Sequence, residues 1–333
     1  MLKSFSLKNR VLGSAAVLAL TAGFVSCTPT QQKTESSPNT PTDSPTSNKD
    51  KPKVIATTSI LCDITKEIAQ DTIDLVCLIP AGSDPHVYEA KPDDRKAIEQ
   101  AKLILYSGYG FEPTLIKLIQ ATKNQAPKIA VSEVAVPKPQ QFQEDGKKED
   151  DPHVWHNAQN GVRIVEIVRD SLGKIYPSNA ATYTSNAKKM TNELTQLDSW
   201  IKSQISTIPV SQRKLVTTHD ALGYYSNAYG IPVEGALQGI STDEKPTAGR
   251  VKDLVEEIKK TGVPTIFAEA TVNPKLIETV AKEANVKVSK RELFTDGLGE
   301  KGSEADTYKK MLIANTQTIV EGLGGKYTPF PGK

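Results

Sequence analysis

Residues 177–209 read PSNAATYTSNAKKMTNELTQLDSWIKSQISTIP, and this stretch decides the fold. Apolar side chains recur in it every three or four residues, which is the spacing of one face of an α-helix. They are Tyr183, Ala187, Met190, Leu194, Leu197, Ile201 and Ile205. Pro177 suits a first helical turn, and Pro209 cannot continue a helix. We therefore predict one helix of about 28 residues, about 42 Å long at about 1.5 Å per residue.

On both sides of this helix, short β-branched runs alternate with amphipathic helical patterns, which is typical of parallel sheets covered by helices. Before it, strands are expected at 54–58, 75–79, 103–106 and 128–131, and helices at 60–70, 92–100 and 111–122. After it, strands are expected at 215–218, 231–233, 265–268 and 286–288, and helices at 220–229, 247–261 and 274–284. The predicted fold class is α/β, with two lobes of parallel-stranded sheets flanked by helices and joined by one long rigid helix.

Residues 1–26 have the pattern of an export signal. Lys3, Lys8 and Arg10 precede an apolar run at 11–25, which has the length of a secretory signal and is short for a membrane span. Removing residues 1–26 takes away three positive charges and no negative charge, so the net charge changes from +2 to −1. That charge and an aromatic content of 6% argue against a nucleic-acid partner.

The junction Ser26-Cys27 resembles a bacterial lipoprotein processing site, in which a cysteine follows an apolar run and a small residue. The resemblance implies cleavage before Cys27 and lipidation of its thiol. Phe24 departs from the pattern, where Leu is commoner, and an ordinary signal peptide is the alternative. The next residues are mostly Thr, Ser, Pro, Asn and Lys, which predicts a disordered tether. The expected organisation is a signal peptide at 1–26, a tether at 27–53, an N-terminal lobe at 54–176, a linking helix at 177–208 and a C-terminal lobe at 209–333.

Two further cysteines, Cys62 and Cys77, are expected at the start of a helix and in the strand that follows it. An exported compartment permits a disulfide between them, and two separate buried thiols are the alternative. Neither cysteine has a second Cys or a His at metal-ligand spacing, so we do not assign them to a metal site.

Three of the four histidines lie where strands are expected to end or helices to begin. His86 follows a predicted strand in GSDPH, His153 precedes a helix in DPHVW, and His219 follows a strand in TTHD. Ligands of parallel α/β sheets bind beyond the carboxyl ends of the strands, and imidazole is the commonest protein ligand for transition metals. A single such histidine is more often structural. Three of four in these positions, two of them in a repeated Asp-Pro-His, favour a metal site.

Four segments, three of which contain these histidines, resemble one protein family in register. They are PAGSDPHVYE at 80–89, DPHVW at 151–155, TTHDALGYY at 217–225 and LFTDGLG at 293–299. Together they resemble the bacterial metal-receptor lipoproteins of zinc or manganese ABC transporters (cluster A-I), and LQGIST at 237–242 resembles the subgroup typified by the treponemal zinc/manganese receptor. The similarity covers about 54–325. It implies that His86, His153, His219 and Asp296 are the metal ligands, two from each lobe, and that a long helix joins the lobes.

The resemblance alone makes Asp296 a ligand candidate, because Asp-Gly-Leu-Gly by itself is typical of a turn. Glu269 ends the predicted strand at 265–268 and could accept a hydrogen bond from the N–H of a metal ligand; a plain ion pair is the alternative. His156 has no counterpart in the family pattern, and we expect it at the surface or at the start of a helix.

The expected metal is one Zn²⁺ or Mn²⁺. Three imidazoles and one carboxylate suit zinc, whereas manganese prefers more oxygen ligands, and its dedicated receptors usually replace the third His with Glu. Zinc-scavenging relatives usually carry a His-rich loop just before the second His. Here that stretch is PQQFQEDGKKEDD at 139–151, which is acidic and contains no His. The choice between the two metals stays open.

The expected function is that of an extracytoplasmic solute-binding protein. It would capture the ion and deliver it to a membrane permease and its ATPase, as a monomer held on the outer (periplasmic) side of the membrane through Cys27. Two alternatives are a zinc-dependent hydrolase and a metal-containing adhesin lipoprotein. Four protein ligands would leave no open position for a catalytic water, and the sequence has no His-Glu-x-x-His, so we do not expect an enzyme.

Overall fold

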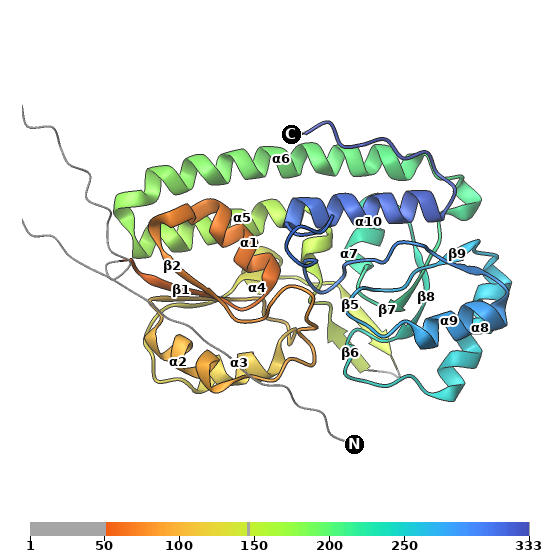
Figure 1. The fold of residues 1–333 in the computed structure, drawn as a ribbon, viewed down its shortest axis with the longest axis horizontal. Helices are drawn as coiled ribbons and strands as arrows, with labels where there is room; N and C mark the ends of the chain where they lie inside the picture. The colour runs from red at the N-terminus through yellow and green to blue at the C-terminus, as the bar shows by residue number, and fades with distance from the viewer. Residues whose placement is uncertain (1–50, 145–146, 333) are drawn as a thin grey trace, which may run out of the picture. The chain divides into compact units, whose positions relative to one another are not determined.

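Helix α6 (Ala180–Ser206) is the long helix predicted from the sequence. It contains 27 residues, and Pro177–Asn179 precede it as a turn of 3₁₀ helix. The computed structural model describes residues 51–144 and 147–332, and in it all seven apolar residues of the predicted face are buried. Helix α6 packs against α5 (Ala158–Ile175) and α10 (Tyr308–Gly322), as Figure 1 shows. It therefore contacts helices from both halves of the chain.

The first sheet has four parallel strands in the order β2-β1-β3-β4. Its strands are β1 (Lys53–Ala56), β2 (Asp74–Cys77), β3 (Leu103–Tyr106) and β4 (Lys128–Ala130). Its helices are α1 (Ser59–Ala69), α2 (Pro92–Gln100), α3 (Pro113–Ala121) and α4 (Val131–Ala135), with a 3₁₀ turn at Gln70–Thr72. Helices cover both faces, so the middle strands are apolar on both sides: Val54 and Ala56 pack into the main core, and Ile55 into a second core with residues of α2 and α3.

The second lobe repeats this plan. Its elements are β7 (Leu215–His219), α7 (Gly223–Tyr229), β8 (Val233–Gln238), α8 (Ala248–Thr261), β9 (Thr265–Ile266), α9 (Lys275–Ala284) and β10 (Lys287–Val288). Strand β7 pairs with β8, and β9 with β10, both in parallel. The backbone N–H of Phe267 donates to Val216 O at 2.9 Å, so the two pairs lie next to each other. The α/β fold with two parallel-stranded lobes and one long helix is confirmed.

Several strands are shorter than expected, and some elements were not expected at all. The strand predicted at 265–268 contains only two residues, and the helix predicted at 220–229 begins at Gly223. Helix α10 and the antiparallel hairpin of β5 (Gln141–Glu144) and β6 (Lys147–Asp150) had no prediction. The hairpin is highly charged, so its hydrophobic pattern contained no strand signal.

Cys62 and Cys77 form a disulfide, which decides between the two alternatives that the sequence left open. Their Cα atoms are 5.7 Å apart, within the usual range for a disulfide. The bond joins α1 to β2 across a sequence separation of 15 residues. A disulfide that closes a loop of that size contributes about 3 kcal/mol to the free energy of unfolding, because it restricts the unfolded chain.

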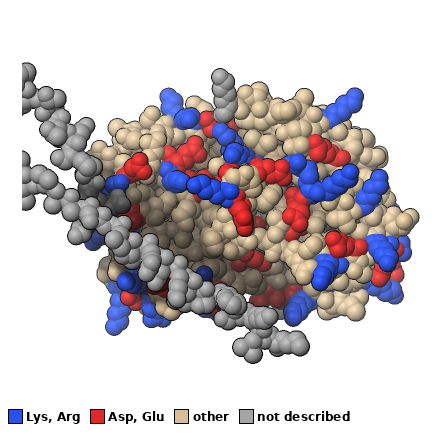
Figure 2. All heavy atoms as spheres, viewed as in Figure 1, with Lys and Arg blue, Asp and Glu red and all other residues tan. Residues whose placement is uncertain are grey.

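The predicted signal peptide at 1–26, its Cys27 and most of the tether at 27–53 lie outside the described residues. Strand β1 begins at Lys53, one residue before its predicted start. Within the described ranges, no helix combines the length and the apolar character needed to cross a bilayer. On the face shown in Figure 2, basic and acidic side chains are interspersed.

Candidate metal centre

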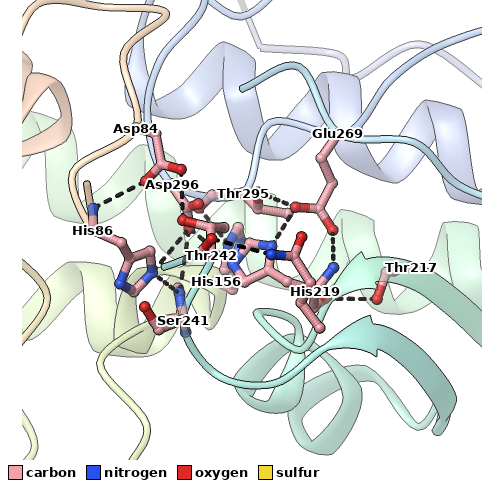
Figure 3. Close-up of polar contacts among 12 residues, drawn as sticks. Asp84, His86, His156, Thr217, His219, Ser241, Thr242, Glu269, Thr295 and Asp296 are labelled. Atoms are coloured by element: carbon pink, nitrogen blue, oxygen red, sulfur yellow. Dashed lines mark hydrogen bonds and ion pairs between the residues drawn. The ribbon is translucent and has the colours of Figure 1, made fainter. Parts of the chain in front are cut away.

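The four candidate ligands come together at the junction of the two lobes. His86 lies in the loop between β2 and α2, His153 precedes a 3₁₀ turn at Val154–His156, His219 ends β7, and Asp296 lies between β10 and α10. One donor atom from each lies within 4.8 Å of the others, and all four residues are buried. Figure 3 shows His86, His219 and Asp296 pointing toward one another. The structure thus brings together residues that are 210 positions apart in the sequence.

The spacing of these donor atoms fits a small divalent ion. Asp296 Oδ1 is 3.2 Å from Nε2 of both His153 and His219, and 3.9 Å from Nε2 of His86. The Nε2 atoms of His86 and His153 are 3.3 Å apart. Two ligands that each lie about 2.0–2.1 Å from a tetrahedral zinc ion are about 3.3–3.4 Å apart. Three of these four distances therefore match a tetrahedral site. The fourth, from Asp296 Oδ1 to His86 Nε2, is longer.

Three polar atoms of the site have no hydrogen-bond partner in the described part of the protein. Among the residues that the structure describes, His219 Nε2 and both carboxylate oxygens of Asp296 have no partner with hydrogen-bond alignment, although His219 Nε2 and Asp296 Oδ1 are 3.2 Å apart. Buried polar atoms without partners are costly, by roughly 1–3 kcal/mol each. A cation between them would satisfy all three atoms at once.

Both Asp-Pro-His segments form the same local turn. Asp84 Oδ1 accepts the backbone N–H of His86 at 2.9 Å, and Asp151 Oδ1 accepts that of His153 at 2.9 Å. An Asp that bonds the backbone two residues later is a common turn, and Pro between them restricts the backbone further. Asp151 Oδ1 also lies 2.9 Å from Nδ1 of His153, which leaves Nε2 of that ring to face the site. The repeat of this tripeptide indicated a shared site, but the role of its aspartate was not predicted.

Glu269 contacts His219 from the side opposite the ligand cluster (Figure 3). Its Oε1 accepts the backbone N–H of His219 at 2.9 Å, and its Oε2 is hydrogen-bonded to His219 Nδ1. The hydroxyl of Thr295 donates to Oε2 at 3.0 Å. A carboxylate on Nδ1 holds the imidazole in the tautomer whose Nε2 carries a free lone pair. The pairing also orients the ring toward Asp296.

His156 is buried, so the surface position was wrong, whereas its place in the 3₁₀ turn just before α5 agrees with the alternative of a helix start. The 3₁₀ turn after His153 directs the His156 ring toward the loop before Asp296, where its Nε2 lies 2.9 Å from Thr295 O. Trp155 Nε1 donates to the same carbonyl oxygen at 3.0 Å. Burial lowers the pKa of His156 to about 3, so the ring is neutral and donates a hydrogen bond to this oxygen. Two ring N–H groups therefore position the backbone next to Asp296, a role that no local sequence pattern indicated.

The pKa values of Asp296 and His219 are shifted in opposite directions by their contact with each other. Burial raises the pKa of Asp296, but His219 and its neighbouring imidazoles outweigh burial and keep this pKa well below its usual value. Burial lowers the pKa of His219, but the charges of Asp296 and Glu269 outweigh it and hold the pKa well above its usual value. Without a metal, a proton on His219 therefore balances part of the negative charge.

The pKa values of the other two imidazoles, those of His153 and His86, are also shifted in opposite directions. Burial lowers the pKa of His153, but Asp151 and Asp296 raise it by more, so the net pKa lies above its usual value. Burial lowers the pKa of His86 to about 3 despite Asp296. The ring of Phe111 packs edge-on against both imidazoles and keeps this side of the site apolar. Its centroid is 4.9 Å from that of His86 and 5.6 Å from that of His153. His86 is therefore already neutral and needs no deprotonation to bind a cation.

Residues 54–322 match the family described as the periplasmic zinc-uptake complex component A. The chain is 38% identical over 284 residues to a metal ABC transporter substrate-binding lipoprotein of Streptococcus sanguinis, covering 83% of this chain and 91% of that one. It is 38% identical over 278 residues to a manganese ABC transporter substrate-binding lipoprotein of Streptococcus mitis, covering 81% and 89%.

The fold matches a solved structure of the periplasmic zinc-binding protein of Treponema pallidum. The TM-score is 0.77 at 33% identity, and the match covers 82% of this chain and 99% of that one. The sequence match extends from β1 to α10, so it includes both lobes, the linking helix and all four residues of the candidate metal centre. The chain therefore belongs to the family of the periplasmic zinc-uptake component A.

Proposed function

We propose that this protein is the substrate-binding component of a metal ABC transporter, and that it binds one Zn²⁺ or Mn²⁺ through His86, His153, His219 and Asp296. The observation that carries the proposal is the buried set of four donor atoms within 4.8 Å of one another. The names of the Streptococcus and Treponema relatives support a zinc or manganese substrate. The metal is here the substrate that is carried and released.

We further propose that the ion passes to a membrane permease with its ATPase, because the streptococcal relatives are named as ABC transporter components. The lipoprotein names of these relatives support export, processing before Cys27 and anchoring to the outer side of the membrane. The organisation predicted from the sequence, with a tether at 27–53 ahead of two lobes and a linking helix, fits a monomer that works close to that membrane.

The donor set favours binding over catalysis. Three imidazoles and one carboxylate complete a four-ligand shell, whereas a catalytic zinc ion keeps one position for water. A carboxylate such as Asp296 can also bind through both oxygens, which would give a five-coordinate site that manganese accepts. We therefore propose a receptor that is selective for small divalent transition metals and has no hydrolase activity.

The test is a calorimetric titration of the metal-free protein with zinc and then with manganese. We expect one ion per chain for each metal, and zinc is expected to displace manganese because nitrogen-rich sites follow the Irving–Williams order. Assaying the zinc-loaded protein for esterase and peptidase activity tests the alternative that it is a hydrolase. A stoichiometry other than one, or turnover by the loaded protein, would contradict the proposal.

The same titration is expected to depend on pH. Metal ligands must be deprotonated, and the pKa values of His219 and His153 are raised in the metal-free protein, so binding at pH 7 displaces protons from these rings. His86 contributes nothing in this range, because its pKa is about 3. Affinity should fall by about tenfold per pH unit for each proton displaced as the pH drops below the raised pKa values. Titrations in two buffers of different ionisation enthalpy would measure the protons released, and equal apparent enthalpies would contradict this assignment.

A further inference from the structure

A side-chain hydrogen bond joins the second lobe to the loop that carries His86. The Thr242 hydroxyl donates to Asp84 Oδ2 at 2.6 Å, while Asp84 Oδ1 accepts the backbone N–H of His86 at 2.9 Å (Figure 3). The same carboxylate therefore holds a metal-site loop on one lobe and a side chain of the other lobe. Residues 158 positions apart meet at this contact.

Thr242 belongs to the loop between β8 and α8, which is anchored within its own lobe. Gln238 Nε2 donates to Thr242 O at 3.1 Å and to Glu244 O at 2.8 Å, so the loop keeps its shape. In the described part of the chain, Thr242 to Asp84 is the only hydrogen bond from residues 239–247 to the first lobe. The loop is thus internally ordered and attached to the opposite lobe at a single point.

This loop also borders a cavity. A cavity of about 680 Å³ is lined by Phe142 and Glu149 of the β5–β6 hairpin and by Ser241, Glu244 and Lys245 of the loop. A loop that is packed against side chains on both sides cannot move without overlap. Here the cavity leaves room for residues 241–245 to withdraw from Asp84 once the Thr242 bond is broken.

The Asp296 side of the site is joined to the first lobe much more firmly. Gly82 N donates to Leu298 O at 2.9 Å, and Leu298 N donates to Ser59 Oγ at 3.0 Å. A Cβ on Gly297 would lie 3.1 Å from Ser59 Oγ, so glycine permits this close approach. With the two ring N–H groups that hold Thr295 O, four hydrogen bonds connect the Asp296 loop to the first lobe. Opening at the Thr242 side therefore breaks fewer contacts than opening at the Asp296 side.

We propose that Thr242 and Asp84 form an inter-lobe latch, and that breaking this single hydrogen bond sets the rate at which the bound metal leaves. The proposal rests on the proposed function, because it needs an ion between the lobes. When the latch is closed, Asp84 keeps the His86 loop against the second lobe. When it opens, Asp84 and His86 are free to move away from His219 together, while Gly82 N stays bonded to Leu298 O of the Asp296 loop.

The kinetic test compares Thr242→Val with Thr242→Ser. Valine has the shape of threonine without the hydroxyl, whereas serine keeps the hydroxyl that donates to Asp84. We expect zinc dissociation, followed by stopped flow with an excess of chelator, to be about tenfold faster in Thr242→Val, which is the size of effect expected for a hydrogen bond to a charged group. Thr242→Ser should stay close to wild type. Thr279→Val, on the exposed face of α9, makes the same chemical change away from the site and should leave the rate unchanged.

A mutant cycle shows whether Thr242 acts through Asp84. In an Asp84→Ala background, Thr242→Val should accelerate zinc dissociation no further, because the bond is already absent. An equal acceleration in both backgrounds would overturn the latch, and so would unchanged dissociation from the single Thr242→Val variant.

Hydrogen exchange of the metal-free protein tests the latch independently of the proposed function, because it needs no bound metal. Thr242→Val should speed amide exchange in residues 82–87 and 239–245, relative to wild type and Thr279→Val. If Thr242→Val speeds exchange but the wild-type protein does not bind zinc, the contact between Thr242 and Asp84 exists. Metal transport, and with it the role of the latch in metal release, would then be overturned. Normal zinc binding with unchanged exchange and dissociation would overturn the latch alone.

Discussion

Replacing His219 by alanine is expected to weaken zinc binding by about 100- to 1000-fold. A four-ligand zinc site is worth roughly 10–16 kcal/mol, so one ligand accounts for roughly 2.5–4 kcal/mol, and about 1.4 kcal/mol corresponds to a factor of ten. His219 Nε2 is buried, has no hydrogen-bond partner among the described residues, and lies 3.2 Å from Asp296 Oδ1. Competition against a chelator of known affinity would measure the change.

Two companion variants make this result specific. His86→Ala removes a ligand that contacts no buried carboxylate except Asp296, so its loss of affinity reports the ligand without leaving Glu269 unpaired. His156→Gln removes the fourth imidazole but keeps an amide N–H that can donate to Thr295 O, and it should bind zinc nearly as well as wild type. An unchanged affinity in His219→Ala, or an equal loss in His156→Gln, would show that the ion binds elsewhere.

Zinc at about 1000 times its dissociation constant is expected to add about 4 kcal/mol to the free energy of unfolding. For a chain of this size, that gain raises the melting temperature by roughly 10 °C. The physical reason is that the donors come from loops far apart in the sequence, so the unfolded chain cannot present them together. Calorimetry of the metal-free protein, with and without added zinc, would measure the shift.

The same measurement on His219→Ala is the control for this stabilisation. The variant should gain much less stability from the same zinc concentration, whereas His156→Gln should retain most of the gain. A rise in melting temperature that is equal in wild type and His219→Ala would mean that zinc stabilises the fold at another position, and the ligand assignment would be wrong.

The local chemistry of the site could be read partly from the sequence. His86, His153 and His219 were expected near element ends, which indicated a shared site; His219 ends β7 and His153 precedes a 3₁₀ turn, whereas His86 lies within the loop between β2 and α2. The repeated Asp-Pro-His also contained a second signal, because Asp84 and Asp151 accept the backbone N–H of His86 and His153, two residues later. This turn chemistry is local, so the aspartates of the repeat, Asp84 and Asp151, could have been predicted as positioning residues from the sequence alone.

Other parts of the site depend on contacts between distant segments. Asp296 lies in a segment that by itself is typical of a turn, and its surroundings come from Trp155 and His156, which hold Thr295 O from the first half of the chain. His156 was expected at the surface or at the start of a helix, and nothing in its neighbours along the chain predicts that its ring is buried against Thr295 O. The contact of Glu269 with His219 likewise joins residues 50 positions apart.

The sequence by itself determined the elements whose signal is local: the long helix from its apolar spacing, the alternation of strands and helices, and three histidines at the strand and helix ends. Periodicity and turn chemistry act over a few residues, so they can be read without knowing the fold. Only the tertiary structure decided that Cys62 bonds to Cys77, that His156 is buried, and that Thr242 reaches Asp84. Each of these is a contact between distant segments, set by how the helices and sheets pack rather than by any pattern along the chain.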